Sequence, residues 1–233
     1  AELYRQIDSI SYLASDIFIP NEYDKLMSVI GAEGTNAYTS TDMTVYVEDI
    51  PSNQIENWAR IEADRFMHPV IRGFHTELET VYEEKNMSLT NDFRKSLEAM
   101  DGILFADHPY GTQTVLGTQE HLKNPSVTNI KNYHKTYYVP NNMAICLSGD
   151  FDPDEMLSII EKYFGQMEPN TKLPEVDFET KTVIESPVSK EVYGLDAENI
   201  MIGWKYPGAG TQEALVAEVV SYILSNGSAG LID

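Results

Sequence analysis

The sequence of 233 residues contains a single cysteine, Cys146, and 16 basic residues against 37 acidic ones. One cysteine excludes an internal disulfide, and its place in the apolar run MAICLSG predicts a buried thiol that packs in a core. The formal net charge of -21 makes nucleic acid and anionic membrane surfaces poor partners, because phosphate binding needs clustered Lys and Arg. An acidic surface favours cationic substrates, although solubility explains the same charge.

Long apolar runs and a recognisable targeting segment are also missing. No run approaches the ~18 residues that a membrane span needs, and no signal peptide is visible. The chain opens within a helical pattern and ends abruptly after SNGSAGLID, so we expect a fragment of a longer protein. Its compartment is therefore not assigned, and a periplasmic or secreted location stays open.

The histidines do not form a metal-binding motif. None of the five occurs in an HxxH, HxxEH or HExxH pattern, whereas catalytic zinc normally takes three protein ligands. The segment DFDPDE at Asp150–Glu155 resembles the start of a calcium loop, but Glu155 stands at the sixth position, where the glycine is required. We interpret Asp152 as a helix cap. The chain alone thus lacks a complete zinc site.

The pattern of regular elements predicts an α+β fold with a mainly antiparallel sheet and helices packed on one face. Helices are expected over the ranges 2–18, 21–31, 52–66, 74–100, 126–139, 153–167 and 211–224. Strands are expected within 35–48, 142–149 and 181–206. In the helix at 52–66, Glu62 recurs on the same side as Trp58 and Phe66.

The range 74–100 contains no Gly or Pro, which favours one long helix. Glu77 and Glu84 are seven residues apart, so they share a helix face within ~20°, with Val81 between them. Two carboxylates beside an apolar stripe are costly unless they meet a partner, a proton or a metal. Two interpretations stay open: a solvated acidic face with Lys85 as counter-charge, or a metal ligand at Glu84 that Glu77 supports.

The stretch Thr35–Ser40 is polar and rich in residues that favour strands. It precedes the alternating residues of the next strand, which predicts an edge position. An edge strand leaves backbone donors and acceptors free to pair with an extended peptide.

Several ordered motifs between about residues 21 and 206 together resemble one family. The stretches NEYDKLMSVIG and GTNAYTSTDMTVYVEDIP, the helix ELETVYEEKN, the loop HPYGTQTVLGTQEHL and the stretch NIKNYHKTYYVPNNMAICLSGDFDPDEMLSIIEKYFG are similar to pitrilysin/insulinase (inverzincin) zinc metallopeptidases. The resemblance implies a metallopeptidase half-unit of that type, with residues 1–170 as an N-terminally truncated zinc-peptidase-like domain and 171–233 as the start of a following α+β subregion, truncated at its C-terminus.

The resemblance also implies site residues and chemistry. Glu84 corresponds to the family's zinc ligand and Glu77 to the carboxylate of the catalytic site that orients the ligands. The substrate-binding edge strand corresponds to five residues in sequence: Thr35, Asn36, Ala37, Tyr38 and Thr39. The family's HxxEH motif, which supplies two histidine ligands and the catalytic base, is not in this chain.

The implied function is that of a fragment of a zinc-dependent metalloendopeptidase, which hydrolyses extended peptides with metal-activated water. The zinc ion belongs to the full-length parent, and we expect the fragment alone to bind none stoichiometrically and to be inactive. The implied partners are a peptide or unfolded protein substrate and a second homologous half or subunit that closes the chamber. A non-catalytic peptide-binding or scaffold subunit of the same fold is the alternative.

Overall fold

The computed structural model describes residues 2–17, 19, 21–123, 126–175 and 179–232. The chain divides into two compact units, each made of two separate segments. The first unit comprises residues 1–87 and 114–177, and the second comprises 88–113 and 178–233. The domain boundary that the sequence predicts at residue 170 concerns domains of a longer protein and not these compact units. It stays a prediction.

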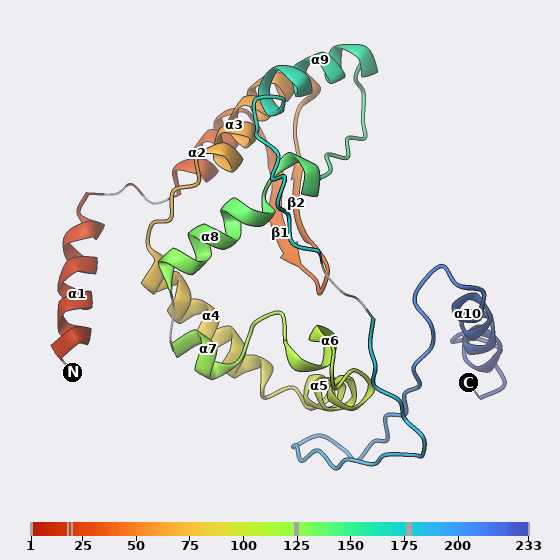
Figure 1. Cartoon of the computed structure of the whole chain (residues 1–233). Coiled ribbons are helices and arrows are strands. Elements are labelled where there is room, and N and C mark those ends of the chain that lie inside the picture. The colour runs from red at the N-terminus through yellow and green to blue at the C-terminus, as the bar shows by residue number, and fades with distance from the viewer. Residues whose placement is uncertain (1, 18, 20, 124–125, 176–178, 233) are drawn as a thin grey trace. The chain divides into compact units, whose positions relative to one another are not determined.

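The first unit combines helices with one antiparallel hairpin (Figure 1). Its elements are α1 (Glu2–Ser15), α2 (Glu22–Val29), β1 (Glu33–Thr39), β2 (Thr44–Asp49), the 3-10 turn η1 (Ser52–Gln54), α3 (Ile55–Met67), α4 (Phe74–Ser88), α7 (Gln119–Lys123), α8 (Val127–Tyr137), the 3-10 turn η2 (Pro140–Asn142) and α9 (Pro153–Phe164). Helix α4 ends where the first unit gives way to the second.

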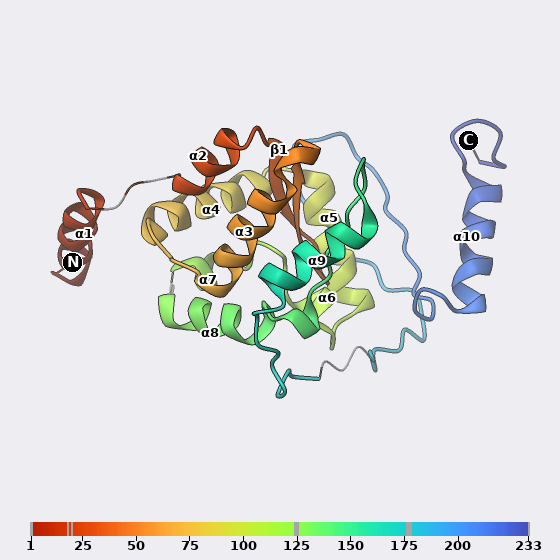
Figure 2. The same cartoon turned by 90° about the horizontal axis from the view of Figure 1, so that it is seen from above.

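The core of this unit lies between α2, α3 and α9. Met27, Ala59 and Ala63 are almost completely buried, and the rings of Trp58 and Phe164 pack with centroids 6.0 Å apart. Figures 1 and 2 both show α3 and α9 side by side. Fully burying a side chain of the size of Met27 or Phe164 contributes about 1.5–3 kcal/mol, so these contacts hold the helices together.

Helix ends follow the expected capping chemistry in most places. Asp152 accepts hydrogen bonds from the backbone N–H groups of Asp154 and Glu155, which confirms that it caps α9. At the C-terminus of α2, Gly31 has φ 78°, and the amides of Gly31 and Ala32 bond to the carbonyls of Ser28 and Met27. This pair of bonds is a Schellman motif, which glycine permits because it tolerates positive φ.

The expectation of one helix over 74–100 is wrong. The structure has two helices, α4 and α5 (Asp92–Leu104), separated at Leu89–Asn91. The side chain of Asn91 accepts a hydrogen bond from the backbone N–H of Arg94 at 2.8 Å and so starts α5. Asparagine competes for backbone donors in this way, and a cap therefore replaces a continuous helix.

The second unit contains α5, α6 (Pro109–Thr112) and α10 (Gln212–Leu224), with a long segment lacking regular structure before α10. Two aspartates hold this segment. The carboxylate of Asp107 accepts bonds from the Lys181 and Thr182 amides, and that of Asp92 accepts bonds from the Leu195 and Asp196 amides. The pKa of Asp92 lies below its usual range because of the Lys95 ammonium and these amides, and that of Asp107 because of the Thr182 and Thr180 hydroxyls and the Lys181 amide.

The fold class is confirmed as α+β with an antiparallel sheet, but the expected strands at 142–149 and 181–206 are wrong. In the described residues the sheet has two strands, β1 and β2. A strand requires a hydrogen-bonded neighbour, and neither range pairs with one here. Between 181 and 196 the carboxylates of Asp92 and Asp107 take up backbone N–H groups that a neighbouring strand would otherwise bind.

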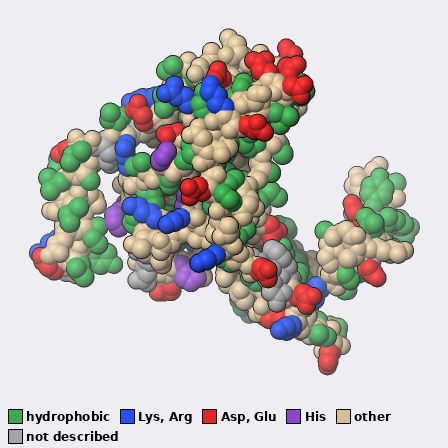
Figure 3. Space-filling view, turned by 45° about the horizontal axis from the view of Figure 1, so that its top comes forward, with side chains coloured by type: hydrophobic (Ala, Val, Ile, Leu, Met, Phe, Trp, Pro, Cys, Tyr) green, Lys and Arg blue, Asp and Glu red, His purple; other side chains and the backbone are tan. Residues whose placement is uncertain are grey.

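Much apolar surface is exposed. Helix α10 exposes Leu215, Val219 and Ile223, and Cys146 is exposed as well, so the expected burial of its thiol is wrong. Figure 3 shows hydrophobic side chains spread over the visible face. In the described part of the chain no helix combines the length and the apolar character that crossing a membrane requires.

Candidate peptide-binding edge and metal-ligand residues

The hairpin β1–β2 carries the five residues expected to bind substrate. Asn36, Ala37, Tyr38 and Thr39 lie opposite Val47, Tyr46, Val45 and Thr44. Gly34 and Thr35 together lie opposite Glu48, which makes a bulge, and Gly34 adopts φ 61° there. All side chains of β1 are exposed, so the structure brings Thr35–Thr39 together on one accessible strand.

The hydrogen-bonding pattern defines which backbone groups of β1 face away from β2. The amide of Ser40 bonds to the carbonyl of Met43 at 2.8 Å and closes the hairpin. Because antiparallel residues alternate between bonded and non-bonded pairs, Tyr38 and Asn36 bond to β2, whereas Ala37 and Thr39 direct their N–H and C=O groups away from it. In the described sheet β1 has one neighbour, so this outward side is an edge.

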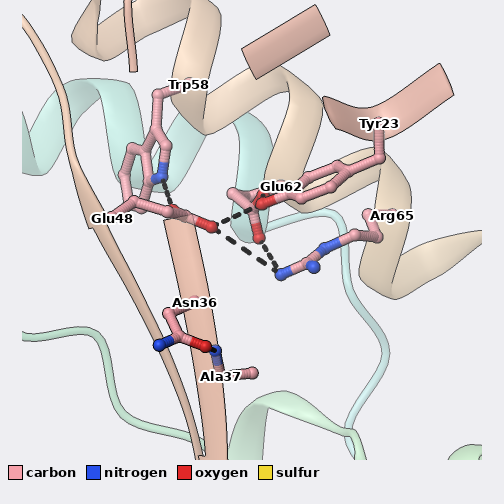
Figure 4. Close-up of polar contacts among 7 residues, drawn as sticks. All are labelled: Tyr23, Asn36, Ala37, Glu48, Trp58, Glu62 and Arg65. Carbon is pink, nitrogen blue, oxygen red and sulfur yellow. Dashed lines mark hydrogen bonds and ion pairs between the residues drawn. The ribbon is translucent and has the colours of Figure 1, made fainter. Parts of the chain in front are cut away.

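A polar cluster that the sequence analysis did not predict ties β2 to α2 and α3 (Figure 4). The hydroxyl of Tyr23 lies 2.5 Å from Glu48 Oε1 and 2.7 Å from Glu62 Oε1. The indole N–H of Trp58 donates to Glu48, and the Arg65 guanidinium lies 2.5 Å from Glu62 Oε2. These bonds anchor the hairpin and thereby position the edge of β1.

The cluster places charged groups where solvent has little access. The side chains of Glu48 and Glu62 are only 8% and 3% exposed, and Arg65 provides the cation beside them. Burial raises the pKa of Glu62, and nearby Glu48 acts in the same direction, against the charge of Arg65 and the hydrogen bond from Tyr23. Tyr23 has one hydroxyl proton for two carboxylates, so a proton on the Glu62 carboxyl group would complete the second contact.

The guanidinium of Arg65 is also enclosed by aromatic rings. Its carbon lies 4.3 Å from the centroid of Tyr23, 4.5 Å from that of Tyr46 and 5.0 Å from that of Phe66. Planar guanidinium groups stack well on such rings, which explains how Arg65 stays beside the two carboxylates.

The glutamates of α4 lie at the border of its buried side. Lys85 is buried and Leu78 and Val81 are half-buried, whereas Glu77 and Glu84 are exposed. Helical geometry puts both glutamates on the same flank of this buried stripe and puts Glu83 on the opposite side of the helix. No hydrogen bond or ion pair links either Glu77 or Glu84 to β1 among the described residues.

The donor set for a zinc ion is incomplete among the residues that the structure describes. No group of three or more His, Cys, Asp or Glu side chains able to hold a metal occurs in the part of the chain that the structure describes. A single exposed carboxylate does not replace the hydration shell of zinc, so these residues by themselves do not fit the ion. The assignments of Glu77 and Glu84 therefore stay predictions.

Comparison with known proteins identifies the relatives of the chain. Residues 126–232 match the sequence profile described as the Peptidase M16 inactive domain. The candidate residues Thr35–Thr39, Glu77 and Glu84 precede this range. The chain is 28% identical to an uncharacterized zinc protease of Mycobacterium leprae over 60% of its own length and 31% of the relative.

Two further relatives extend the similarity. The chain is 27% identical to insulin-degrading enzyme of Mus musculus over 66% of its own length and 16% of the enzyme, and 21% identical to the zinc protease PqqE of Helicobacter pylori over 95% and 51%. It thus spans between about a sixth and about half of the length of these relatives.

Solved structures show the same fold. A protease from Helicobacter pylori superposes with a TM-score of 0.63 at 21% identity, over 68% of this chain and 39% of that one. The periplasmic protease PqqL from Escherichia coli gives a TM-score of 0.61 at 21% identity, over 69% and 19%. These findings confirm the resemblance that the sequence motifs carry: the chain is similar to zinc metallopeptidases of the insulinase type, and it shares the fold of the solved proteases.

Proposed function

We propose that this chain is part of a zinc-dependent metalloendopeptidase and supplies the edge strand that binds its peptide substrate. The observation that carries the proposal is the outer edge of β1, where the backbone groups of Ala37 and Thr39 point away from β2. Thr35–Thr39 pair with the substrate backbone, Glu84 serves as a zinc ligand, and Glu77 is the catalytic-site carboxylate that orients it. The remaining ligands lie outside this chain.

Strand addition suits an enzyme that acts on extended peptides. Backbone hydrogen bonds form with any residue except proline, so an edge strand recognises unfolded chains largely independently of sequence. The exposed side chains of β1 leave room for a second strand beside it. The net charge of -21 supports cationic over anionic peptides as ligands.

A second candidate function is that of a non-catalytic peptide-binding or scaffold subunit. The match of residues 126–232 to an inactive domain favours it. Both candidate functions use the edge strand to bind peptide, but only the peptidase requires a bound zinc ion. Reading the coding sequence upstream of Ala1 for an HxxEH motif separates them, because the motif supplies two histidine ligands and the base.

The edge strand is tested by removing one outward N–H group. Thr39→Pro deletes the donor that faces the incoming peptide, at an edge position where proline is tolerated. Thr39→Val is the matched control, because valine keeps the N–H and favours strands. The probe is a fluorescent eight-residue peptide of alternating threonine and lysine, and the readout is the dissociation constant by anisotropy.

We expect Thr39→Pro to weaken binding at least about fivefold, the effect of one lost backbone hydrogen bond. Thr39→Val should bind like the unmodified chain. A peptide with methyl groups on alternate amide nitrogens should not bind the unmodified chain, because it lacks the N–H groups that pair with β1. Equal affinities for the proline and valine variants would contradict recognition by strand addition.

A further inference from the structure

One of the outward donors of β1 is already occupied. The side-chain oxygen Oδ1 of Asn36 accepts a hydrogen bond from the backbone N–H of Ala37 at 2.8 Å (Figure 4). Both residues are exposed, so the bond lies at the surface and not in a packed interior. Ala37 is one of the two β1 residues whose backbone groups point away from β2.

This bond competes with any strand that approaches the edge. An incoming backbone carbonyl must bind the Ala37 N–H, and that N–H cannot make a second hydrogen bond of full strength. Pairing therefore requires the Asn36 side chain to rotate away and lose its own bond. Free edge donors otherwise act as templates for unwanted pairing between chains, which natural edge strands avoid by blocking them.

We propose that Asn36 caps the peptide-binding edge, so that an extended peptide binds only by displacing the Asn36 side chain from the Ala37 amide. The proposal rests on the proposed function and assigns Asn36 a role in specificity. A ligand that presents a well-placed carbonyl replaces the lost bond, whereas a poorly registered segment does not. The cap therefore weakens all pairing at this edge and weakens misregistered pairing most.

The first test measures hydrogen exchange of the Ala37 amide by NMR on the 233-residue chain. Asn36→Leu keeps the size of the side chain and removes the acceptor, so the Ala37 amide should exchange about threefold to tenfold faster. Asn36→Asp keeps an acceptor oxygen and should retain the protection. The amides of Thr39 and of the buried Ala59 serve as internal references for the edge and for folding.

The second test measures affinity for the threonine–lysine peptide. Asn36→Leu and Asn36→Ala should each bind about threefold to tenfold more tightly than the unmodified chain, because no bond has to be displaced. Both variants should also self-associate at lower concentration. Unchanged exchange of the Ala37 amide, or weaker peptide binding by both variants, overturns the proposal.

The outcomes separate the cap from the proposed function. If the peptide binds neither the unmodified chain nor the variants, peptide recognition by this edge is wrong. Faster Ala37 exchange together with increased self-association in the variants still establishes the cap in that case. Tighter peptide binding by the variants supports both.

Discussion

At the scale of residues, the cluster of Tyr23, Glu48, Trp58, Glu62 and Arg65 places two nearly buried carboxylates beside one guanidinium. It joins the strand β2 to two helices through hydrogen bonds to nearly inaccessible carboxylates. Removing one member of such a group leaves the others unpaired in a dry place, which costs more than the pair itself contributes.

Because of its place in this cluster, we expect Glu62 to increase the free energy of unfolding as the pH falls. Its pKa in the folded chain is raised, chiefly by burial, above the value of about 4.3 for an unfolded glutamate. Between these values the folded state binds more protons than the unfolded state, so the free energy of unfolding rises as the pH falls through that window. Glu62→Gln should lack this contribution.

Hydrogen exchange of the buried Ala59 and Ala63 amides at pH 7 and at about pH 5 reports the effect after correction for intrinsic rates. Relative to Glu62→Gln, the unmodified chain should protect these amides more strongly at about pH 5 than it does at pH 7. A difference that is constant or shifts the other way would refute the role of Glu62.

Sequence patterns predicted individual residues well where the interaction is local. Asp152 accepts bonds from amides two and three residues ahead, as a capping residue does, and it was identified from sequence. Asn21, which begins the range 21–31 expected to be helical, adopts φ 56° and its side chain makes no cap bond to α2. Glu62 was placed beside Trp58 on one helix side, but its hydrogen-bond partner Tyr23 lies 39 residues away in sequence.

At the scale of elements, the break between α4 and α5 can be tested with Asn91→Ala. This substitution should destabilise the chain if Asn91 caps α5 and should stabilise it if the helix were continuous. If Asn91 caps α5, Asn91→Ala removes the bond to the Arg94 amide and costs about 1 kcal/mol. In an uninterrupted helix, alanine would instead stabilise, because it has the higher helix propensity.

Hydrogen exchange at the Arg94 amide distinguishes the two cases. We expect about fivefold faster exchange in Asn91→Ala and little change in Asn91→Ser, because serine retains a capping oxygen. Slower exchange in the alanine variant would restore the single helix over 74–100.

Helices with a clear apolar period were predictable, and strands were predictable only where their partner is adjacent in sequence. The hairpin β1–β2 follows from the alternation around Val45 and Val47 and a short turn. The ranges 142–149 and 181–206 contain residues that favour strands, but strand formation depends on a partner that local sequence does not specify. Segment 181–196 is instead held by Asp92 and Asp107.

At the scale of the whole molecule, charge and exposed apolar surface act against each other. The net charge of -21 opposes association, whereas apolar side chains such as those of Leu215, Val219 and Ile223 favour it. Raising the salt concentration from about 0.05 M to about 1 M shortens the screening length from roughly 14 Å to 3 Å and weakens the repulsion.

We therefore expect the sedimentation coefficient of the 233-residue chain to increase with salt as oligomers form. Substituting the three apolar residues of α10 by serine should reduce this increase, and the matched substitution of exposed Thr76, Thr80 and Thr90 by serine should not. A sedimentation coefficient independent of salt would show that the exposed apolar surface does not drive association.

The proposed zinc site depends most on the choice between two adjacent glutamates. Glu84 lies on the flank of the buried stripe of α4 together with Glu77, whereas Glu83 lies on the side of the helix opposite to that stripe. The resemblance to zinc metallopeptidases and this helical geometry are the two grounds for proposing Glu84. The two glutamates are matched in chemistry and exposure, so each serves as the control for the other.

The decisive measurement is the zinc content of the purified full-length gene product by elemental analysis, for Glu84→Ala and for Glu83→Ala, with peptidase activity measured alongside. We predict that Glu84→Ala loses zinc and activity, because a catalytic zinc with one of three protein ligands removed binds weakly. Glu83→Ala should keep both. Full zinc content and activity in Glu84→Ala, with loss of both in Glu83→Ala, would contradict the assignment.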